Sequence, residues 1–179
     1  MGYTVRRISA DEWLRLRDLR LEALQDSPTA FVSQYAEERV KSDAEWRSRA
    51  LRSCGEHPQP DGGLVVTLAL EHAGSDHWVG MATVFQEPGA AEPQAQVVGV
   101  YVQLAHRGRA AGAAEVLVRG ALGWARGDGA AERVRLFVRE DNRRAMAFYG
   151  RLGFVETGVA IPYPPDPSVS ECEMDYRGV

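Results

Sequence analysis

The segment from Val97 to Gly112 carries the most chemically informative pattern in the chain. Val97-Val98-Gly99-Val100-Tyr101-Val102 alternates as a strand does, and Arg107-Gly108-Arg109-Ala110-Ala111-Gly112 follows it as a small-residue turn before a long helical stretch. The first amides of a helix lack partners inside the helix and carry the positive end of its dipole. Small side chains let a diphosphate approach such amides. The segment predicts a diphosphate site; the alternative is a glycine turn that only lets the helix pack closely.

Two better-known phosphate-binding patterns are absent from this turn. No GK[ST] sequence follows it, so it is not a Walker loop, and the GxGxxG spacing of a dinucleotide fold is missing. Charge nevertheless favours an anionic ligand here. Residues 103–151 hold ten arginines and five acidic residues, within a chain whose net charge is −4. A local positive field suggests a small polyanion, although an arginine-rich solvated surface would give the same count.

Length and composition exclude several classes of protein. The chain has 179 residues, 45% of them hydrophobic and 26% charged, which fits one domain covering residues 1–179. A pI of about 5.6 argues against nucleic acid as the main partner. No apolar run is long enough to span a membrane, and the N-terminus lacks the apolar stretch of a signal peptide, so we expect no membrane partner and a cytoplasmic location.

The cysteines and histidines do not form a recognisable framework. Cys54 and Cys172 are far apart and outside any CxxC pattern, so we expect reduced thiols. The four histidines lack metal-ligand spacing such as HxxxH, so we expect no metal site.

The periodicity of apolar residues predicts the elements that hold the central turn. We expect a strand over 3–8, helices over about 9–25, 34–40 and 42–52, and strands over 64–71, 77–86 and 94–103. A helix over about 107–126, a strand over 134–138 and a helix from 141 or 142 to 152 follow. The last strands are expected over 154–161 and 171–176, separated by a proline-rich loop over 162–167. This order predicts a mixed α+β or α/β layer fold rather than a regular doubly wound sheet.

A second pattern lies downstream of the turn. Asn142-Arg-Arg-Ala145-Met-Ala-Phe-Tyr149-Gly-Arg-Leu152-Gly153-Phe154 reads as NxxAxxxY followed by LGF. Together with Arg107 to Gly112, which reads as [QR]xxGx[GA], it resembles the GNAT superfamily of acyl-CoA-dependent N-acetyltransferases. The two motifs are in that family's order and separation, and they cover roughly residues 97–158. Ala110 departs from the usual glycine, but alanine is small and keeps its amide.

The resemblance implies a GNAT-like central sheet, mixed but mostly antiparallel and flanked by helices, with a splayed strand pair that holds coenzyme A. It implies acetyl-CoA as the acyl donor. The backbone at Val100, Tyr101 and Val102 would pair with the pantetheine arm, and Asn142 would hydrogen-bond the same arm. The diphosphate would be held by the turn and helix start, with Arg107 at the family's Q/R position: Arg107, Gly108, Arg109, Ala110, Ala111, Gly112 and Ala113.

Tyr149 is the expected catalytic residue. Attack of a neutral amine on a thioester releases a thiolate that needs a proton, and a tyrosine beside the sulfur can supply it. Without the motif, Tyr149 would be read as a packed aromatic beside Phe148. Some family members carry a glutamate base where this chain has Gln96, which cannot take a proton. Other candidates are Glu71, His72, Glu37 and Glu38, and none is preferred.

The acceptor pocket of this family lies between the early helices and the later loops, here about 28–35 and 163–168. Phe31, Tyr35 and Tyr163 are the expected substrate-binding residues, with ordinary packing as the alternative. We therefore expect acetylation of a primary amine, of a small molecule in the first place, by direct attack in a ternary complex. The alternatives are a protein or peptide amine as acceptor, and a non-catalytic acyl-CoA-binding regulatory module. Similar proteins are commonly dimers, so a homodimer is compatible with the resemblance.

Overall fold

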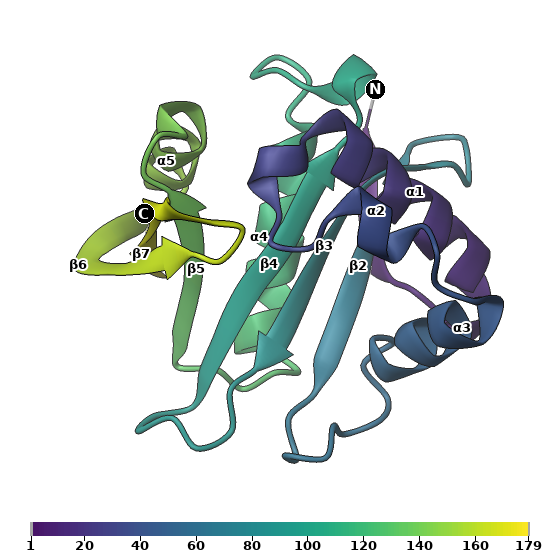
Figure 1. Ribbon diagram of the computed structural model, residues 1–179, viewed down its shortest axis with the longest axis horizontal. Coiled ribbons are helices and arrows are strands. Elements are labelled where there is room, and N and C mark those ends of the chain that lie inside the picture. Colours follow the sequence, from purple (N-terminus) through teal and green to yellow (C-terminus); the bar gives the residue numbers. More distant parts are fainter. Residues whose placement is uncertain (1, 179) are drawn as a thin grey trace.

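A computed structural model describes residues 2–178 and places seven strands in one sheet, in the order β1-β2-β3-β4-β5-β7-β6 (Figure 1). All neighbouring strands are antiparallel except β4 and β5, which are parallel. The mixed, mostly antiparallel sheet predicted from the sequence is confirmed. The strands are β1 (Tyr3–Arg7), β2 (Val65–His72), β3 (Trp78–Gln86), β4 (Gln94–Val102), β5 (Arg133–Arg139), β6 (Phe154–Tyr163) and β7 (Asp166–Tyr176).

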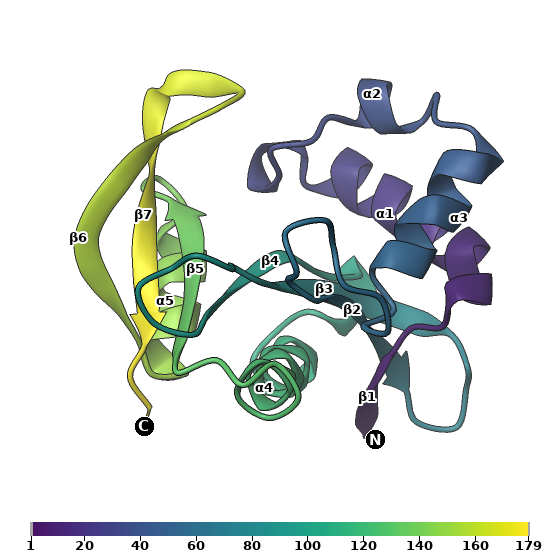
Figure 2. The same cartoon turned by 90° about the horizontal axis from the view of Figure 1, so that it is seen from below.

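Helices cover both faces of the sheet (Figure 2). One face carries α1 (Trp13–Asp26), α2 (Tyr35–Glu38) and α3 (Asp43–Arg52), and α4 (Ala113–Arg126) crosses the other. The remaining helix, α5 (Arg143–Arg151), packs against β6. No helix within residues 2–178 combines the length and apolarity needed to cross a membrane.

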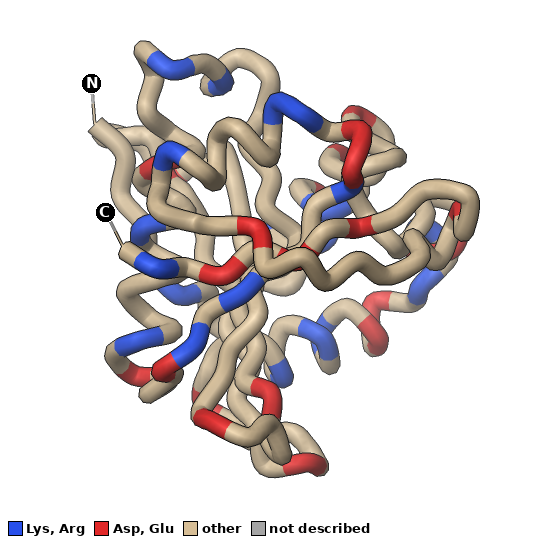
Figure 3. Tube along the Cα trace, turned by 90° about the vertical axis from the view of Figure 1, so that its left-hand side faces the viewer, with Lys and Arg blue, Asp and Glu red and all other residues tan. Residues whose placement is uncertain are grey.

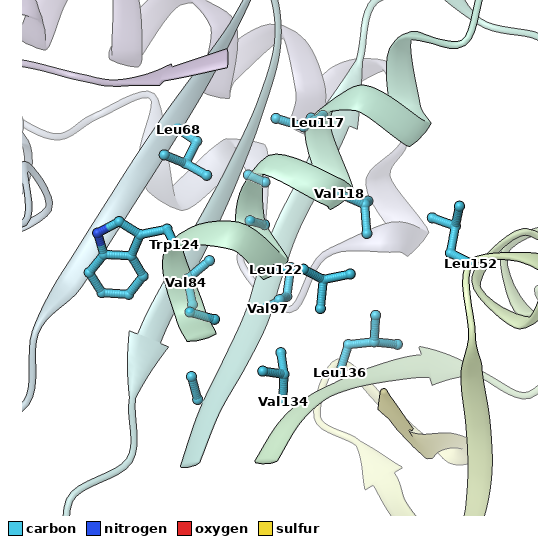
Figure 4. Packing of buried hydrophobic residues seen from close by; sticks show 14 of the residues in the cluster. Leu68, Val84, Val97, Leu117, Val118, Leu122, Trp124, Val134, Leu136 and Leu152 are labelled. Atoms are coloured by element: carbon cyan, nitrogen blue, oxygen red, sulfur yellow. The ribbon is translucent and has the colours of Figure 1, made fainter. Parts of the chain in front are cut away.

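The larger hydrophobic core lies between α4 and the sheet (Figure 4). Leu117, Val118 and Leu122 recur on one side of α4 at helical spacing, and they are buried against strand residues such as Val84 and Val97. Each such side chain contributes roughly 1.5–3 kcal/mol through burial. A second core under α1 and α3 holds the opposite face of the sheet.

The predicted start of the long helix was wrong by six residues. The helix begins at Ala113 rather than Arg107, because Gly108 has φ 113° and Gly112 has φ 69°, both outside the range of a right-handed helix. A capping box begins α3: the Ser42 amide donates to the Glu45 carboxylate, and the Glu45 amide donates to the Ser42 hydroxyl.

The proline-rich loop predicted over 162–167 was also wrong. Strand β6 continues through Pro162, which lies opposite Ser170 of β7, and Tyr163 lies opposite Asp166 across a two-residue turn. Because β6 is the edge strand of the sheet, a missing proline N–H is tolerated there. The hairpin therefore reaches further toward the early helices than the sequence indicated.

Charged residues are interspersed along the trace rather than divided between two faces (Figure 3). Their densest network joins β5 to β7. Arg133 contacts both Glu173 and Asp175, and Arg135 donates to Glu173 at 2.7 Å. Both acidic side chains are buried and depend on these guanidinium groups, so the network fastens the two strands together.

Candidate active site

The parallel strands β4 and β5 pair for only a short distance. Their register runs from Gln94 with Arg133 to Gln96 with Arg135, and no further pairing of the two strands follows within residues 2–178. Beyond Gln96, β4 stays paired with β3 on its other side. The main-chain groups of β4 that face β5 are thus open along the second half of the strand, and the splayed pair expected from the resemblance is confirmed.

A bulge in β4 lies in this open stretch. Met81 lies opposite Tyr101 and Thr83 opposite Val98, so β4 has one more residue than β3 over the same length. Gly99 takes φ 63° there, a conformation that costs other residues more than glycine. A bulge bends its strand and interrupts pairing. The bulge at Gly99 therefore lies in the part of β4 that β5 has already left, beyond the last paired residue, Gln96.

The turn between β4 and α4 presents an unusual run of free donors. No main-chain hydrogen bond of good geometry is donated by the amides from Gly108 to Glu115 within residues 2–178, although residues 109–111 form a turn; Val116 is the first of this stretch to bond, to the Gly112 carbonyl. Gly112 is the N-cap residue and has no side chain to satisfy them. Such donors need an acceptor, and together with the helix dipole they favour an anion.

A cavity of about 810 Å³ lies between this turn, the open half of β4 and α5. Its lining includes four arginines, Arg107, Arg109, Arg144 and Arg151, and one acidic residue, Glu115. It also includes apolar residues: Val100 and Val102 from β4 and, from α5 and its end, Ala145, Phe148, Tyr149 and Leu152. This lining suits a ligand that combines an anionic group with a less polar part.

Not every residue predicted to bind cofactor faces the cavity. Val100, Val102, Arg107, Gly108, Arg109, Gly112 and Asn142 line it, whereas Ala110, Ala111 and Ala113 do not. The Tyr101 side chain is buried on the opposite face of the sheet, where its hydroxyl donates to Glu22 at 3.0 Å. Tyr101 and these three alanines can therefore contribute only main-chain groups to the predicted binding of the cofactor.

Arg107 is held on the protein rather than free to reach a ligand. Its Nε donates to the Val102 carbonyl at 2.7 Å, and a terminal nitrogen pairs with Asp26 at the end of α1. The Arg107 guanidinium holds the pKa of Asp26 below its ordinary value. Arg107 therefore ties the turn to β4 and α1, and it fixes the direction of the free amides.

Asn142 and Tyr149 belong to α5. The Asn142 side-chain oxygen accepts the Ala145 amide at 3.1 Å, which caps the helix and leaves the NH₂ group beside the cavity. Tyr149 is half-buried, with its ring 5.1 Å from that of Phe148 and 5.6 Å from that of Phe154. Desolvation raises the pKa of Tyr149, so the hydroxyl keeps its proton at neutral pH.

The predicted acceptor residues lie on the other face of the sheet. The Tyr163 hydroxyl, at the end of β6, donates to the Phe31 carbonyl at 2.7 Å, and both residues are buried. Tyr35 is half-buried against the second core, which contains Phe31. The hairpin of β6 and β7 thus contacts the segment between α1 and α2, and the two predicted aromatics meet at that contact.

None of the candidate bases lines the cavity. Glu71 accepts from Arg6 at 2.9 Å, and His72 packs against Tyr3 near the far edge of the sheet. Glu38 is buried and accepts from Arg49 at 2.7 Å, while Glu37 is exposed.

One group of potential metal ligands does occur after α3. The donor atoms of Cys54, Glu56 and His57 lie within 4.8 Å of one another, and none of these residues lines the cavity. The expectation that the chain has no metal site stays a prediction.

Several residues of the cavity were not predicted as site residues. Arg144, Phe148 and Arg151 come from α5, a helix that has a strongly apolar side but no fully buried residue. An amphipathic helix whose apolar side is only half covered borders an open space. The spacing of Ala145, Phe148 and Leu152 carried this signal in the sequence.

Comparison with known proteins agrees with this geometry. The model of the acetyltransferase (GNAT) family matches residues 13–154. No curated protein matches the chain. Among solved structures, a chimera of the spermidine N-acetyltransferase SpeG from Vibrio cholerae and hSSAT is similar, with a TM-score of 0.70, 16% identity and coverage of 98% of this chain and 95% of that one.

Two further structures show the same fold with other molecules bound. Arabidopsis thaliana NAA60 in complex with acetyl-CoA matches with a TM-score of 0.63 and 15% identity, over 98% of both chains. The NatC complex bound to Gag peptide and CoA matches with a TM-score of 0.65 and 14% identity, also over 98% of both chains. With its splayed strands, and with a family match over most of its length, the chain belongs to the acetyltransferase (GNAT) family and is an acyltransferase.

Proposed function

We propose that residues 1–179 form one N-acetyltransferase domain that moves the acetyl group of acetyl-CoA to a primary amine of a small molecule, by direct attack in a ternary complex. The observation that carries the proposal is the run of amides from Gly108 to Glu115 that lack good main-chain hydrogen bonds, in the turn whose Gly108, Arg109 and Gly112 line the cavity. A diphosphate satisfies those donors, and the open half of β4 offers main-chain groups to the pantetheine arm.

The residues of the cavity fit coenzyme A in charge and in shape. Arg109, Arg144 and Arg151 line the cavity and would give it a positive charge toward the diphosphate, and Asn142, which also lines it, would hydrogen-bond the arm. When bound, acetyl-CoA supplies an activated acetyl group as its thioester. The chain's part is to hold the thioester at the split between β4 and β5, with the cavity on one face of the sheet and the acceptor on the other.

Tyr149 holds the proton that the departing thiolate needs. Its pKa is raised by burial, so the hydroxyl is protonated whenever the acceptor amine is partly neutral. An alkyl ammonium has a pKa of about 10, so the neutral amine is the minor form at pH 7. In the proposed step the Tyr149 hydroxyl gives its proton to the departing thiolate as the carbon–sulfur bond breaks. The acceptor nitrogen loses its own proton to solvent or a base, and solvent returns a proton to Tyr149.

The closed acceptor side favours a small molecule over a peptide. Tyr163 and Phe31 join the hairpin to the early helices by a buried hydrogen bond, and a peptide chain would have to pass around that contact. A peptide amine as acceptor is the second candidate, since the similar NatC structure holds a peptide. A non-catalytic acyl-CoA-binding module is the third, supported by Gln96 in place of a glutamate base.

An acetyl-CoA assay that follows free thiol release separates the three candidates. Small amines such as amino acids, polyamines and aminoglycosides form one arm of the panel, and peptides with free N-termini or lysines form the other. We expect turnover with members of the first arm. Turnover with peptides alone would contradict the small-molecule proposal, and tight binding of acetyl-CoA without turnover would identify a regulatory module.

A further inference from the structure

Arg20 occupies a position on α1 where a charged residue is costly. The helix buries Leu16, Leu19, Ala23 and Leu24 against the second core, and Arg20 lies among them with only 7% of its surface exposed. Burying a guanidinium requires opposite charge and hydrogen bonds to replace its water.

The protein supplies only part of that compensation. The Arg20 Nε is 3.6 Å from Glu38, beyond hydrogen-bond distance, and it has no hydrogen-bond partner within residues 2–178. Glu38 is itself shared, since it also pairs with Arg49 at 2.7 Å and Lys41 at 3.7 Å. Three cations surround one carboxylate, so the cluster has an excess of positive charge and an unused donor.

Arg20 lies beside the bulge where the sheet opens. A Cβ on Gly99 would be 3.7 Å from the Nη1 of Arg20. The guanidinium also lies over the ring of Phe31, 4.8 Å from its centre, next to the Tyr163 contact. The neighbouring residue, Val100, lines the cavity on the opposite face. The guanidinium therefore faces the acceptor side of the split, one residue away from the wall of the donor cavity.

We propose that Arg20 binds the carboxylate of the acceptor, so that the acceptors of this protein are α- or β-amino acids; this inference rests on the proposed acetyl transfer to a small amine. The planar guanidinium presents paired donors that match a carboxylate. The proposed function places the thioester at the split beside Val100, and Arg20 lies beside the adjacent Gly99, so in that complex a carboxylate on Arg20 would be close to the attacked carbonyl. Only an amine one or two carbons from the carboxylate spans so short a distance.

The first test needs no mutation. Each amino acid in a panel, including methionine and β-alanine, is compared with its amide and with the amine that lacks the carboxylate. We expect kcat/KM for the free acids to exceed that of both analogues by about 100-fold, because the analogues leave a buried charge unpaired. Equal or better activity with the amides or amines would overturn the assignment.

A variant pair separates carboxylate binding from a merely structural ion pair. Arg20→Met should raise KM for the free acids about 100-fold while the analogues keep their own values, and Arg20→Lys should restore part of the preference. Arg49→Met is the matched control, because it also removes a partner of Glu38 but lies over Trp46 rather than Phe31. An equal loss for acids and analogues in Arg20→Met would show a structural role.

A binding readout separates this inference from the proposed function. In the presence of coenzyme A, N-acetyl amino acids should raise the melting temperature of the native protein and of Arg49→Met, but not of Arg20→Met. Stabilisation without any turnover would leave the carboxylate site standing and remove acetyl transfer. Acetylation of simple amines, together with no acetylation of amino acids and no change of melting temperature with their N-acetyl forms, would support acetyl transfer and overturn the carboxylate site.

Discussion

Replacing Tyr149 with phenylalanine should separate catalysis from folding more cleanly than most active-site changes. The substitution removes one hydroxyl and keeps the ring, which packs on Phe148 and Phe154. Desolvation is the cause of the raised pKa of Tyr149, and within residues 2–178 its hydroxyl has no hydrogen-bonded partner to lose. The free energy of unfolding should therefore change by less than about 0.5 kcal/mol, since no donor or acceptor elsewhere is left unpaired.

Turnover should respond very differently. Protonation of a leaving group by a positioned acid is worth about 10²–10⁴-fold in rate. We expect kcat of Tyr149→Phe to fall at least about 100-fold, with the Kd for coenzyme A unchanged within about twofold. Thiol release under saturating acetyl-CoA measures the first quantity, and calorimetry measures the second.

The pH dependence of the rate gives a second test of the role of Tyr149. Because the pKa of Tyr149 lies above its ordinary value, its acid form persists as pH rises, while the acceptor amine becomes neutral. The native rate should rise with pH and show no descending limb below about pH 10. Tyr149→Phe should keep this shape at a lower level.

The matched control is Tyr176→Phe. The centre of the Tyr176 ring lies 5.3 Å from that of Phe154, but Tyr176 does not line the cavity. Its turnover should be unchanged. An undiminished kcat in Tyr149→Phe would refute the assignment of Tyr149, and an equal loss in both variants would trace the effect to packing.

Four other substitutions test parts of the structure. Gly112→Ala should cost about 1–2 kcal/mol of stability, because an L residue at φ 69° is strained. Gly123 is exposed inside α4, so Gly123→Ala should instead add about 0.5–1 kcal/mol. Thermal unfolding measures both changes. Tyr163→Phe should lower stability by about 1–2 kcal/mol, since it leaves the Phe31 carbonyl unpaired, and should raise KM for the acceptor more than for acetyl-CoA; unaltered acceptor KM would contradict the placement of the acceptor. Hydrogen bonds from Arg6 lower the pKa of Glu12 from 4.5 to about 2, so their stabilisation is complete above pH 4.5 and disappears as pH falls toward 2. On acidification over that range the native protein should lose about 2 kcal/mol more than Glu12→Gln, as measured by urea unfolding, and parallel curves would count against the pair.

The strand, the turn and the central helix could be predicted from local sequence, because alternation, small residues and helical spacing act within short segments. The start of α4 could not be placed well. Gly108 and Gly112 suit both a helix approached by a ligand and a loop at positive φ, and only the backbone conformation decides between them. The amides that matter are therefore partly loop amides, and the free donors are more numerous than a helix end alone provides.

The opening of the sheet depends on pairing between distant strands. The sequence of β4 alone does not indicate that its pairing with β5 ends at Gln96. The splayed strands could be predicted only through the resemblance to a family. The burial of Arg20 also depends on contacts between distant segments. Within the sequence Arg20 is one of three arginines in the segment that forms α1, and only the packing of Phe31, Glu38 and Gly99 around it shows that the charge is buried and incompletely paired.

Binding of coenzyme A in the proposed manner depends most directly on the amides from Gly108 to Glu115. A titration of the ¹⁵N-labelled protein with coenzyme A, and in parallel with pantetheine, which lacks the diphosphate, reports on each amide separately. We expect coenzyme A to shift the resonances of this segment strongly, and pantetheine to shift those of β4 and α5 while leaving the segment unchanged. Binding of coenzyme A that leaves the 108–115 amides unshifted would contradict the proposed diphosphate site.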